Sequence, residues 1–268
     1  MLKMAFSTLG CPDWDFEDIL STAKDLGYDA IEVRGIGREL HAPAAKPFQP
    51  EYIENTKAKL QNLGLTIACF TSSVRLNEDY RIESHMQAGR EYIELAAKMG
   101  VPYVRVMPDS GPEVGHVVFH SVAERLVAIA DYAAQYGVTI LVENNGAFAK
   151  SSEMLKLMET VGRSNVKVLW DVNHPVRNFG ETPQETWNTL KEYIRYLHIK
   201  DSVDGADGTE YRMIGDGDLP LKEIVDLLKA ADFDGYLSLE WLKRWCLSLA
   251  EPGIVFPQYV NYMKTLAK

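Results

Sequence analysis

Four residues in the second half of the sequence have side chains that bind divalent metal ions, and each lies at or near the end of a short apolar run. Glu143 follows TILV, Asp171 follows VKVLW, His198 lies in RYLHI and Glu240 follows YLSL. They are 28, 27 and 42 residues apart, which fits repeated strand-and-helix units of roughly 30 residues with some loop insertions. Three carboxylates brought together would repel one another, and a bound cation would remove that repulsion. The pattern therefore predicts a site for one divalent metal ion.

Three carboxylates and one imidazole form a mostly oxygen ligand set, which favours Mn²⁺ or Mg²⁺, with Co²⁺ and Zn²⁺ as alternatives. Each residue taken alone has a purely structural interpretation. A carboxylate at a strand end often caps the next helix or pairs with a lysine, and a histidine can be a hydrogen-bonded core residue. The coincidence of all four on successive strands favours the metal site.

The stretch VLWDVNHP, residues 168–175, adds a second imidazole close to one of the predicted ligands. His174 follows Asp171 by three positions, and Pro175 is expected to keep the chain between them out of a helix. His174 then either hydrogen-bonds a substrate hydroxyl at the edge of the site or lies on the surface.

The elements that must position these residues alternate regularly along the chain. Strands are predicted at residues 4–9, 30–34, 65–72, 103–107, 139–144, 166–171, 195–201 and 236–241. Segments of helical period follow at 16–27, 50–64, 86–100, 122–137, 151–162, 183–194, 220–233 and 254–268, and six of them end at or near glycine, a common helix stop. Eight such pairs, in a chain close to the ~250 residues usual for the fold, predict a single-domain (β/α)8 TIM barrel over residues 1–268.

A doubly wound open sheet is the alternative fold. It usually carries a glycine fingerprint in its first strand-to-helix turn, whereas TLGCPDW contains only Gly10. In a barrel, the chemistry lies at the C-terminal ends of the strands, so the four predicted ligands converge there. The two-residue period of a strand places Leu141, Leu169, Tyr196 and Ser238 on the same interior face as those ligands.

The composition of the chain limits the kinds of molecule that the protein is expected to bind. Of 268 residues, 46% are hydrophobic, and 28 basic against 38 acidic residues leave a net charge of −10, which disfavours nucleic acid or an anionic membrane as partner. A small-molecule substrate fits better. Three cysteines without a CxxC pair, and the lack of a signal-like or membrane-spanning apolar run, lead us to expect a cytoplasmic protein. The protein could also assemble with copies of itself, as a homodimer or a homotetramer.

The segments LVENN, LWDVNH, LHIKD and LSLEW, in that order, with YRMIGDGDLP between the last two, carry a family resemblance. Through them the whole chain resembles the sugar phosphate isomerase/epimerase superfamily of xylose isomerase-like TIM barrels, which includes ketose 3-epimerases and inosose dehydratases. The resemblance implies that Glu143, Asp171, His198 and Glu240 are metal ligands. It also implies that Glu143 and Glu240 are the catalytic acid–base pair.

The resemblance extends to residues around the predicted metal. It implies that His174 and Arg212 contact substrate oxygens. Glu32 matches a glutamate frequent on the second strand of the family and would lie behind the ligands, with an ion pair to Arg34 or Arg105 as the structural alternative.

Two further residues are candidates for substrate contact. Lys200, just beyond the strand that carries His198, could bind an anionic group, and Trp14, just past the first strand, could supply an apolar face to a sugar. The superfamily also includes zinc apurinic endonucleases, which act in DNA repair and need an Asp-x-His segment where this chain has Asp216-Gly217-Asp218. DNA repair is therefore disfavoured.

The activity implied is metal-dependent isomerisation or epimerisation of a ketose or a related keto-polyol. A proton next to the carbonyl is removed, an enediolate forms, and a proton is returned to the other face or to the neighbouring carbon. Loss of a β-hydroxyl from the same intermediate would make the protein an inosose dehydratase-type lyase. A non-catalytic, metal-dependent sugar-binding protein is the alternative from another class.

Overall fold

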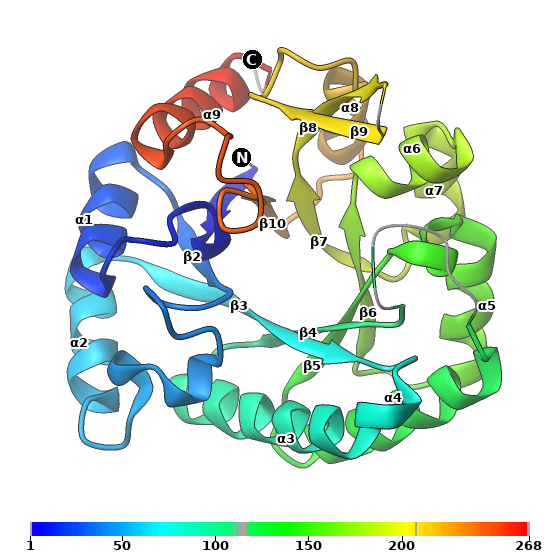
Figure 1. Ribbon diagram of the computed structural model, residues 1–268, viewed down its shortest axis with the longest axis horizontal. Coiled ribbons are helices and arrows are strands. Elements are labelled where there is room, and N and C mark those ends of the chain that lie inside the picture. The colour runs from blue at the N-terminus through cyan, green and yellow to red at the C-terminus, as the bar shows by residue number, and fades with distance from the viewer. Residues whose placement is uncertain (1, 110, 112–116, 207, 267–268) are drawn as a thin grey trace. The chain divides into compact units, whose positions relative to one another are not determined.

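Eight strands of the computed structural model form a closed barrel in the order β1-β10-β7-β6-β5-β4-β3-β2 (Figure 1). The structure describes residues 2–109, 111, 117–206 and 208–266. Strand β1 pairs in parallel with β10 and β2, and β3 to β6 pair in parallel in sequence order. The predicted (β/α)8 fold is confirmed, and the doubly wound alternative is not what forms.

The chain divides into two compact units, residues 1–68 with 197–268 and residues 69–196. The first contains β1 (Lys3–Ser7), α1 (Phe16–Leu26), β2 (Ala30–Val33), α2 (Ile53–Leu63), β8 (Asp201–Gly205), β9 (Gly208–Arg212), α8 (Leu221–Ala230), β10 (Tyr236–Leu239) and α9 (Pro252–Leu266). The prediction that residues 1–268 act as one domain stays a prediction.

The second unit contains β3 (Thr66–Arg75) from Cys69 onward, α3 (Ile82–Met99), β4 (Tyr103–Met107), α4 (Phe119–Ala134), β5 (Thr139–Glu143), α5 (Ser151–Val161), β6 (Val166–Asp171), α6 (Asn173–Phe179) and α7 (Pro183–Leu190). Strand β7 (Ile194–Ile199) begins in the second unit and ends in the first. Short 3-10 turns lie at Thr8–Gly10, Ala42–Ala44, Lys46–Phe48, Asp79–Arg81 and Gly146–Ala149.

The first unit is held together by an aromatic cluster beneath α9. Phe6 of β1 stacks on Phe256 of α9 with ring centroids 4.2 Å apart, and Tyr28 packs edge-on against Phe6. The buried hydroxyls of this cluster have partners, since Tyr28 donates to the Phe256 carbonyl oxygen and Tyr259 donates to that of Leu237, each at 2.8 Å. Burial with a satisfied hydroxyl is the favourable way to place tyrosine in a core, and it fixes α9 against β1 and β10.

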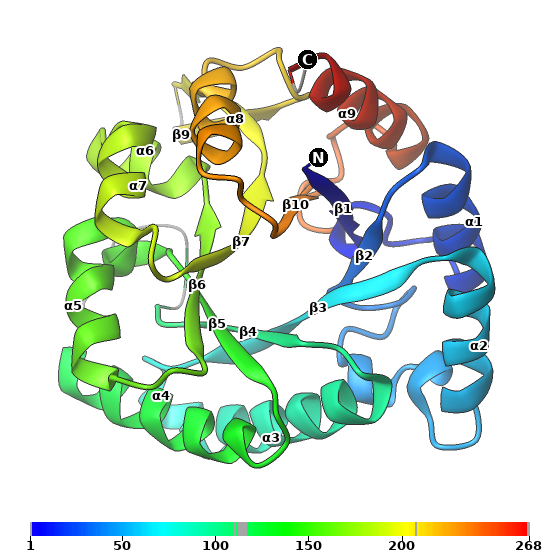
Figure 2. The same ribbon diagram turned by 180° about the vertical axis from the view of Figure 1, so that it is seen from behind.

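In the second unit, α3, α4 and α5 follow one another along the outside of β4 to β6, as both views of the ribbon show (Figures 1 and 2). The strands are aligned so that Glu143, the last residue of β5, pairs with Leu169 of β6. Asp171 therefore lies two residues further along its own strand. Helix α7 packs behind β6, where Trp187 lies against Trp170 with ring centroids 6.3 Å apart.

The expectation that Pro175 keeps its segment out of a helix is wrong. Helix α6 begins at Asn173 and contains both His174 and Pro175. A proline in the first turn of a helix needs no N–H partner and has a suitable φ, so it is tolerated there. His174 is therefore carried on a short helix that starts two residues after Asp171.

A second difference from prediction is an antiparallel hairpin between β7 and α8. Strands β8 and β9 pair from Asp201 opposite Arg212 to Gly205 opposite Gly208, in a region expected to be a loop. The last helix was predicted to reach residue 268, but its final two positions lie outside the described residues. In the part of the chain that the structure describes, no helix is both long and apolar enough to cross a membrane.

Candidate metal centre

Glu143 ends β5 beside a buried cation of the neighbouring strand. The Arg105 Nε atom lies 3.1 Å from Glu143 Oε2, and both side chains are about 5% exposed or less. Arg105 also donates from Nη1 to the carbonyl oxygen of Ser72 on β3 at 2.9 Å. The guanidinium supplies a positive charge next to this buried carboxylate, which suits Glu143 to a role as an anionic ligand or base.

Asp171 is fully buried, and its backbone is held by the residue that follows Glu143. The Asn144 amide accepts from the Asp171 N–H through Oδ1 at 2.5 Å and donates to the Asp171 carbonyl oxygen at 3.2 Å. One carboxylate oxygen, Asp171 Oδ1, accepts from the N–H of Asn173 at 2.9 Å, at the start of α6. These bonds fix the end of β6 relative to the end of β5.

His174 lies above Asp171 within the same unit. Its Nδ1 is 3.1 Å from the carbonyl oxygen of Asn144, and its Nε2 is 3.7 Å from Asp171 Oδ2. A carbonyl oxygen can only accept, so Nδ1 carries the proton in this contact. The ring is 5% exposed, which rules out the surface position considered for it.

In the other unit, His198 of β7 is fully buried between two carboxylates. Its Nε2 lies 3.0 Å from Glu32 Oε2, and its Nδ1 lies 3.3 Å from Glu240 Oε1. Glu32 therefore pairs with His198, and it does so from β2, adjacent to β1 in the barrel. The two ring nitrogens of His198 face different carboxylates.

The electrostatics of Glu32 decide which nitrogen of His198 carries the proton. Burial by itself raises the pKa of Glu32, but the charge of His198 and hydrogen bonds from His198, Ser7 and Ser238 lower it from 4.5 to about 2. An ionised Glu32 can only accept hydrogen bonds, so Nε2 is the protonated nitrogen. In the neutral ring, Nδ1, on the side of Glu240, is then the unprotonated nitrogen that can bind a metal, with Glu32 as the carboxylate that commonly backs such a histidine.

Glu240 follows β10 by one residue and is 6% exposed. Its N–H donates to the carbonyl oxygen of Ile199 at 3.0 Å, which ties it to the end of β7. Oε2 forms a short ion pair with Lys200 Nζ, while Oε1 faces His198. Lys200 is itself 2% exposed, so it lies beside Glu240 and away from bulk solvent.

Glu143, Asp171, His198 and Glu240 each offer one ligand atom, and these four atoms lie within 4.8 Å of one another. The set of three carboxylates and one imidazole nitrogen fits a hard divalent cation. All four residues are buried, and although Arg105 and Lys200 lie beside two of the carboxylates, a central cation would bring all three next to one positive charge. The cluster could therefore bind a metal ion, as the strand-end pattern predicts.

Arg212 and Trp14 occupy more open positions in the first unit. Arg212 ends β9, is exposed, and pairs through Nη2 with Glu210 Oε2 at 2.5 Å. Trp14 is half-buried in the loop after β1 and packs edge-on against Phe256 with ring centroids 5.6 Å apart. Substrate contact by either residue stays a prediction.

A single buried carboxylate shapes the loop that connects β9 to α8. Asp201 Oδ2 accepts from the N–H groups of Gly215 and Gly217 at 2.8 and 3.0 Å, and Oδ1 accepts from those of Ser202 and Leu219 at 2.9 and 3.2 Å. Four N–H donors on one carboxylate satisfy it without a cation. The aspartate of LHIKD is therefore a structural residue of the loop, next to Lys200.

Sequence reasoning missed Arg105 and Asn144 as members of the site. Asn144 belongs to the LVENN segment, and its position after a predicted ligand was a usable signal. Arg105 lies inside the apolar run YVRVM, where only the fold reveals its carboxylate partner.

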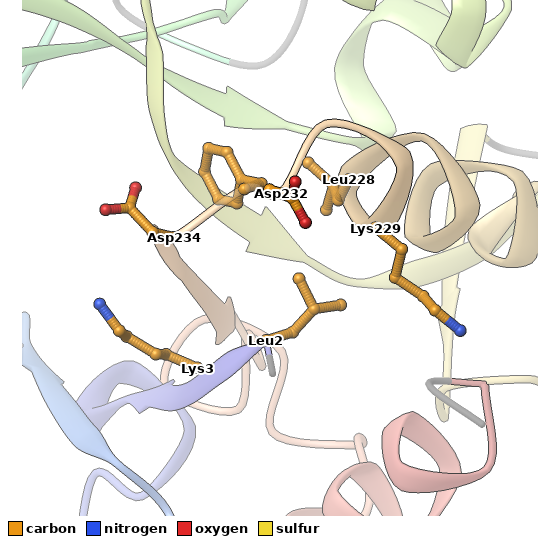
Figure 3. Close-up of a pocket in the computed structure, with 7 residues that line it drawn as sticks. Leu2, Lys3, Leu228, Lys229, Asp232 and Asp234 are labelled. Carbon is orange, nitrogen blue, oxygen red and sulfur yellow. The ribbon is translucent and has the colours of Figure 1, made fainter.

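A cavity of about 480 Å³ in the first unit lies away from these residues (Figure 3). Leu2 and Lys3, at the start of β1, line one side of it, and residues from the end of α8 and the turn into β10 line the rest: Leu228, Lys229, Asp232, Phe233 and Asp234. It is therefore at the N-terminal ends of β1 and β10, whereas His198 and Glu240 lie at the C-terminal ends of their strands. Barrel enzymes carry their chemistry at the latter ends.

Known proteins of the same fold resemble this chain over nearly its whole length. A family model described as a xylose isomerase-like TIM barrel matches residues 20–259. The fructoselysine 3-epimerase of Shigella flexneri is 24% identical over 282 residues, covering 99% of this chain and 98% of that protein.

Two solved structures share the whole fold at low identity. The D-psicose 3-epimerase of Clostridium cellulolyticum H10, solved with D-tagatose, is 16% identical with a TM-score of 0.78, and all of both chains is covered. A xylose isomerase-like TIM barrel protein from Mycobacterium smegmatis, solved in complex with magnesium, is 15% identical with a TM-score of 0.76, covering 100% of this chain and 97% of that one.

Proposed function

The chain belongs to the xylose isomerase-like TIM barrel family, and we propose that it is a divalent-metal-dependent epimerase or isomerase of a ketose or a related keto-polyol. The observation that carries the proposal is the buried cluster of Glu143, Asp171, His198 and Glu240. These four residues are proposed to hold the metal. Mn²⁺ or Mg²⁺ suits three carboxylates best, and Co²⁺ or Zn²⁺ is the alternative.

The proposed reaction begins with removal of a proton from the carbon next to the substrate carbonyl. A bound divalent metal supplies Lewis-acid stabilisation of the negative charge that develops on the substrate oxygens. Glu143 and Glu240 act as the acid–base pair, one taking the proton and the other returning one. Return to the opposite face of the same carbon gives the epimer, and return to the neighbouring carbon gives the isomer.

We assign the surrounding residues to binding the substrate or to orienting a metal ligand. His174, whose Nδ1 is engaged by the Asn144 carbonyl oxygen, presents Nε2 to a substrate hydroxyl. Arg212 and Trp14 contact the substrate from the loops, and Lys200 reaches it from beside Glu240. Glu32 acts through His198 by fixing the orientation of the imidazole ring.

The names of the relatives support an epimerase of ketose-type substrates, since two of them are 3-epimerases. An unphosphorylated substrate is favoured by how the loop cation Lys243 is used. Lys243 Nζ donates to the carbonyl oxygens of Leu247 and Leu249 at 2.7 and 2.6 Å and pairs with Glu251 Oε1 at 2.8 Å. This cation therefore serves the protein's own loop.

The location and assembly of the protein remain proposals that the sequence alone supports. We place it in the cytoplasm because its three cysteines have no disulfide spacing. For the assembly, we propose a homo-oligomer, either a dimer or a tetramer.

The first experiment is proton exchange in D₂O, followed by NMR. Metal-stripped and Mn²⁺-reconstituted protein is incubated with a panel of ketoses, a fructosamine, hydroxypyruvate and inososes. The expected result is Mn²⁺-dependent deuterium uptake at the carbon next to the carbonyl, with an inverted or isomerised product. Deuterium uptake followed by loss of water would show the dehydratase alternative.

The matched variant is Glu143→Gln, which keeps the shape of the side chain and removes its basicity. Exchange is expected to fall by 10²-fold or more, the usual contribution of a general base, while Glu159→Gln, on the exposed surface of α5, leaves it unchanged. Tight binding of a sugar without exchange, equal in the wild type and in Glu143→Gln, would favour a sugar-binding protein and overturn the enzyme proposal.

A further inference from the structure

We propose that Arg105 and Lys200 are positioning residues, each of which holds one of the two acid–base glutamates in place from within its own unit. The inference rests on the proposed function for the role of the glutamates. It names two residues that act through Glu143 and Glu240 and that take no part in binding the metal themselves.

The position of Arg105 is fixed by hydrogen bonds to the neighbouring strand. Its Nη1 is fixed to the Ser72 carbonyl oxygen at 2.9 Å, and Ser72 Oγ in turn donates to the Arg105 carbonyl oxygen at 2.6 Å. This reciprocal pair of bonds joins β3 to β4 and leaves Nε 3.1 Å from Glu143 Oε2, at ion-pair distance. The guanidinium always carries its positive charge and is fixed by these bonds, so its attraction holds the Glu143 carboxylate in position beside it.

Lys200 plays the corresponding part for Glu240. Its Nζ contacts Oε2, and the other oxygen of the same carboxylate, Oε1, is 3.3 Å from His198 Nδ1. Nζ also lies 5.9 Å from the centre of the Tyr211 ring on β9, a cation–π distance. The hairpin thus packs against the lysine that orients Glu240, and each oxygen of Glu240 has a separate neighbour.

Orientation matters because a carboxylate that shares a metal site and moves protons must be held to within about 0.5 Å of its working position. A long glutamate side chain has three rotatable bonds and does not hold that position by itself. Each glutamate has instead one oxygen in contact with a buried cation of its own unit. The same arrangement of a buried cation next to a glutamate oxygen therefore occurs twice, on two pairs of strands. The cation is an arginine in one case and a lysine in the other.

The test measures Mn²⁺ binding by electron paramagnetic resonance in Arg105→Met and Lys200→Met, with no substrate present. Removing an outer-shell partner typically costs 10- to 100-fold in metal affinity or activity, and that loss is expected in both variants. The spectrum of bound Mn²⁺ is also expected to change, because the ligand carboxylate is no longer fixed. Arg163→Met and Lys222→Met, which remove exposed cations paired with Asp131 and Asp226, are the controls and should leave both readouts unchanged.

Conservative variants separate positioning from a general loss of stability. Lys200→Arg keeps a long cation beside Glu240 and is expected to recover affinity to within about fivefold of wild type, whereas Lys200→Met does not. In turnover, both methionine variants should lower kcat by 10- to 100-fold, and Arg105→Met, which removes no proposed substrate contact, should leave KM nearly unchanged. If either methionine variant does not fold, Arg105→Lys and Lys200→Arg are compared with wild type, and altered Mn²⁺ spectra are expected from Arg105→Lys.

These measurements distinguish a failure of the proposed positioning role from a failure of the proposed function. Wild-type protein that binds Mn²⁺ but exchanges no proton overturns the proposed function, and the positioning role is still judged by the affinities and spectra. Wild-type affinity, spectrum and kcat in both methionine variants overturn the positioning role and leave the proposed function intact. A fall in melting temperature alone, with Mn²⁺ affinity and kcat unchanged, also overturns it.

Discussion

His198 Nε2 lies 3.0 Å from Glu32 Oε2, with both side chains fully buried and 166 residues apart in sequence. This contact sets the direction in which the imidazole presents Nδ1. It also leaves a carboxylate behind the proposed metal that does not itself belong to the ligand cluster. Glu32 can therefore be substituted while His198, the proposed metal ligand that it supports, is left unchanged.

Glu32→Gln is expected to weaken Mn²⁺ binding by about 10- to 100-fold, because the neutral amide holds the imidazole less firmly and lowers its basicity. Isothermal titration calorimetry with Mn²⁺ measures the change. Glu54→Gln, which alters an exposed glutamate paired with Lys57 on α2, is the control. Equal affinities for wild type and Glu32→Gln would show that Glu32 is only a core ion-pair partner.

Removal of divalent metal is expected to lower the stability of the wild-type protein, because the buried carboxylates of the cluster lose their counter-charge. Mn²⁺ at one hundred times its Kd should raise the free energy of unfolding by about 2.7 kcal/mol. Thermal unfolding with EDTA and with graded Mn²⁺ measures the gain. Asp171→Asn should show a clearly smaller gain, and an identical metal response in that variant would contradict a role for Asp171 as ligand.

Gly217→Ala is expected to destabilise the protein by roughly 1–3 kcal/mol, the usual range for overpacking. A Cβ at this position would lie 2.1 Å from Asp201 Oδ1, which four backbone N–H donors hold with the rest of its carboxylate, and 2.5 Å from the backbone oxygen of Ser202. Urea unfolding measures the loss. Gly253→Ala, on α9 where a Cβ meets nothing within 4 Å, is the control and should be neutral or slightly stabilising.

Glu78 is expected to make the second unit sensitive to acid. Burial raises its pKa, but hydrogen bonds and charges from Arg75 and His85, at 2.8 and 3.1 Å, outweigh burial and lower the pKa below 4.5. A depressed pKa in the folded state gives stability that is present above the unfolded pKa and is lost as the pH falls through the folded one. Because solvent screens the partly exposed Arg75, Glu78→Gln should cost only about 0.5–1.5 kcal/mol at pH 7, the range of an ordinary hydrogen bond, and less at pH 3.5.

Urea unfolding at both pH values measures this difference, with Glu159→Gln as the exposed control. A loss in Glu78→Gln that is the same at pH 7 and pH 3.5 would mean that the charge of Glu78 contributes nothing to stability.

The barrel and the ends of its strands were predictable because each strand is a short apolar run and each predicted ligand closes one. Glu143 and Asp171 end β5 and β6 as expected, His198 lies one residue before the end of β7, and Glu240 lies one residue beyond β10. Parallel strands in a barrel bring those ends to one rim. Local pattern and fold-level geometry were sufficient for this part of the molecule.

The contacts behind the ligands were not predictable, because they join residues that no local pattern connects. Arg105 is a single charge in an apolar strand, and its partner Glu143 lies on the next strand. The hairpin of β8 and β9 was missed for a different reason. Its second strand is almost wholly exposed, so it lacks the alternation of apolar and polar residues by which a half-buried strand is identified.

The four N–H bonds to Asp201 make the loop between β9 and α8 a promising place to diversify the protein. The shape of this loop depends on one buried carboxylate and on the backbone of Gly215, Gly217 and Leu219. The side chains of Met213 and Asp216 contribute nothing to those four bonds. A library that randomises these two positions while keeping Asp201 and both glycines should therefore yield mostly folded variants, and selection for altered substrate range could begin there.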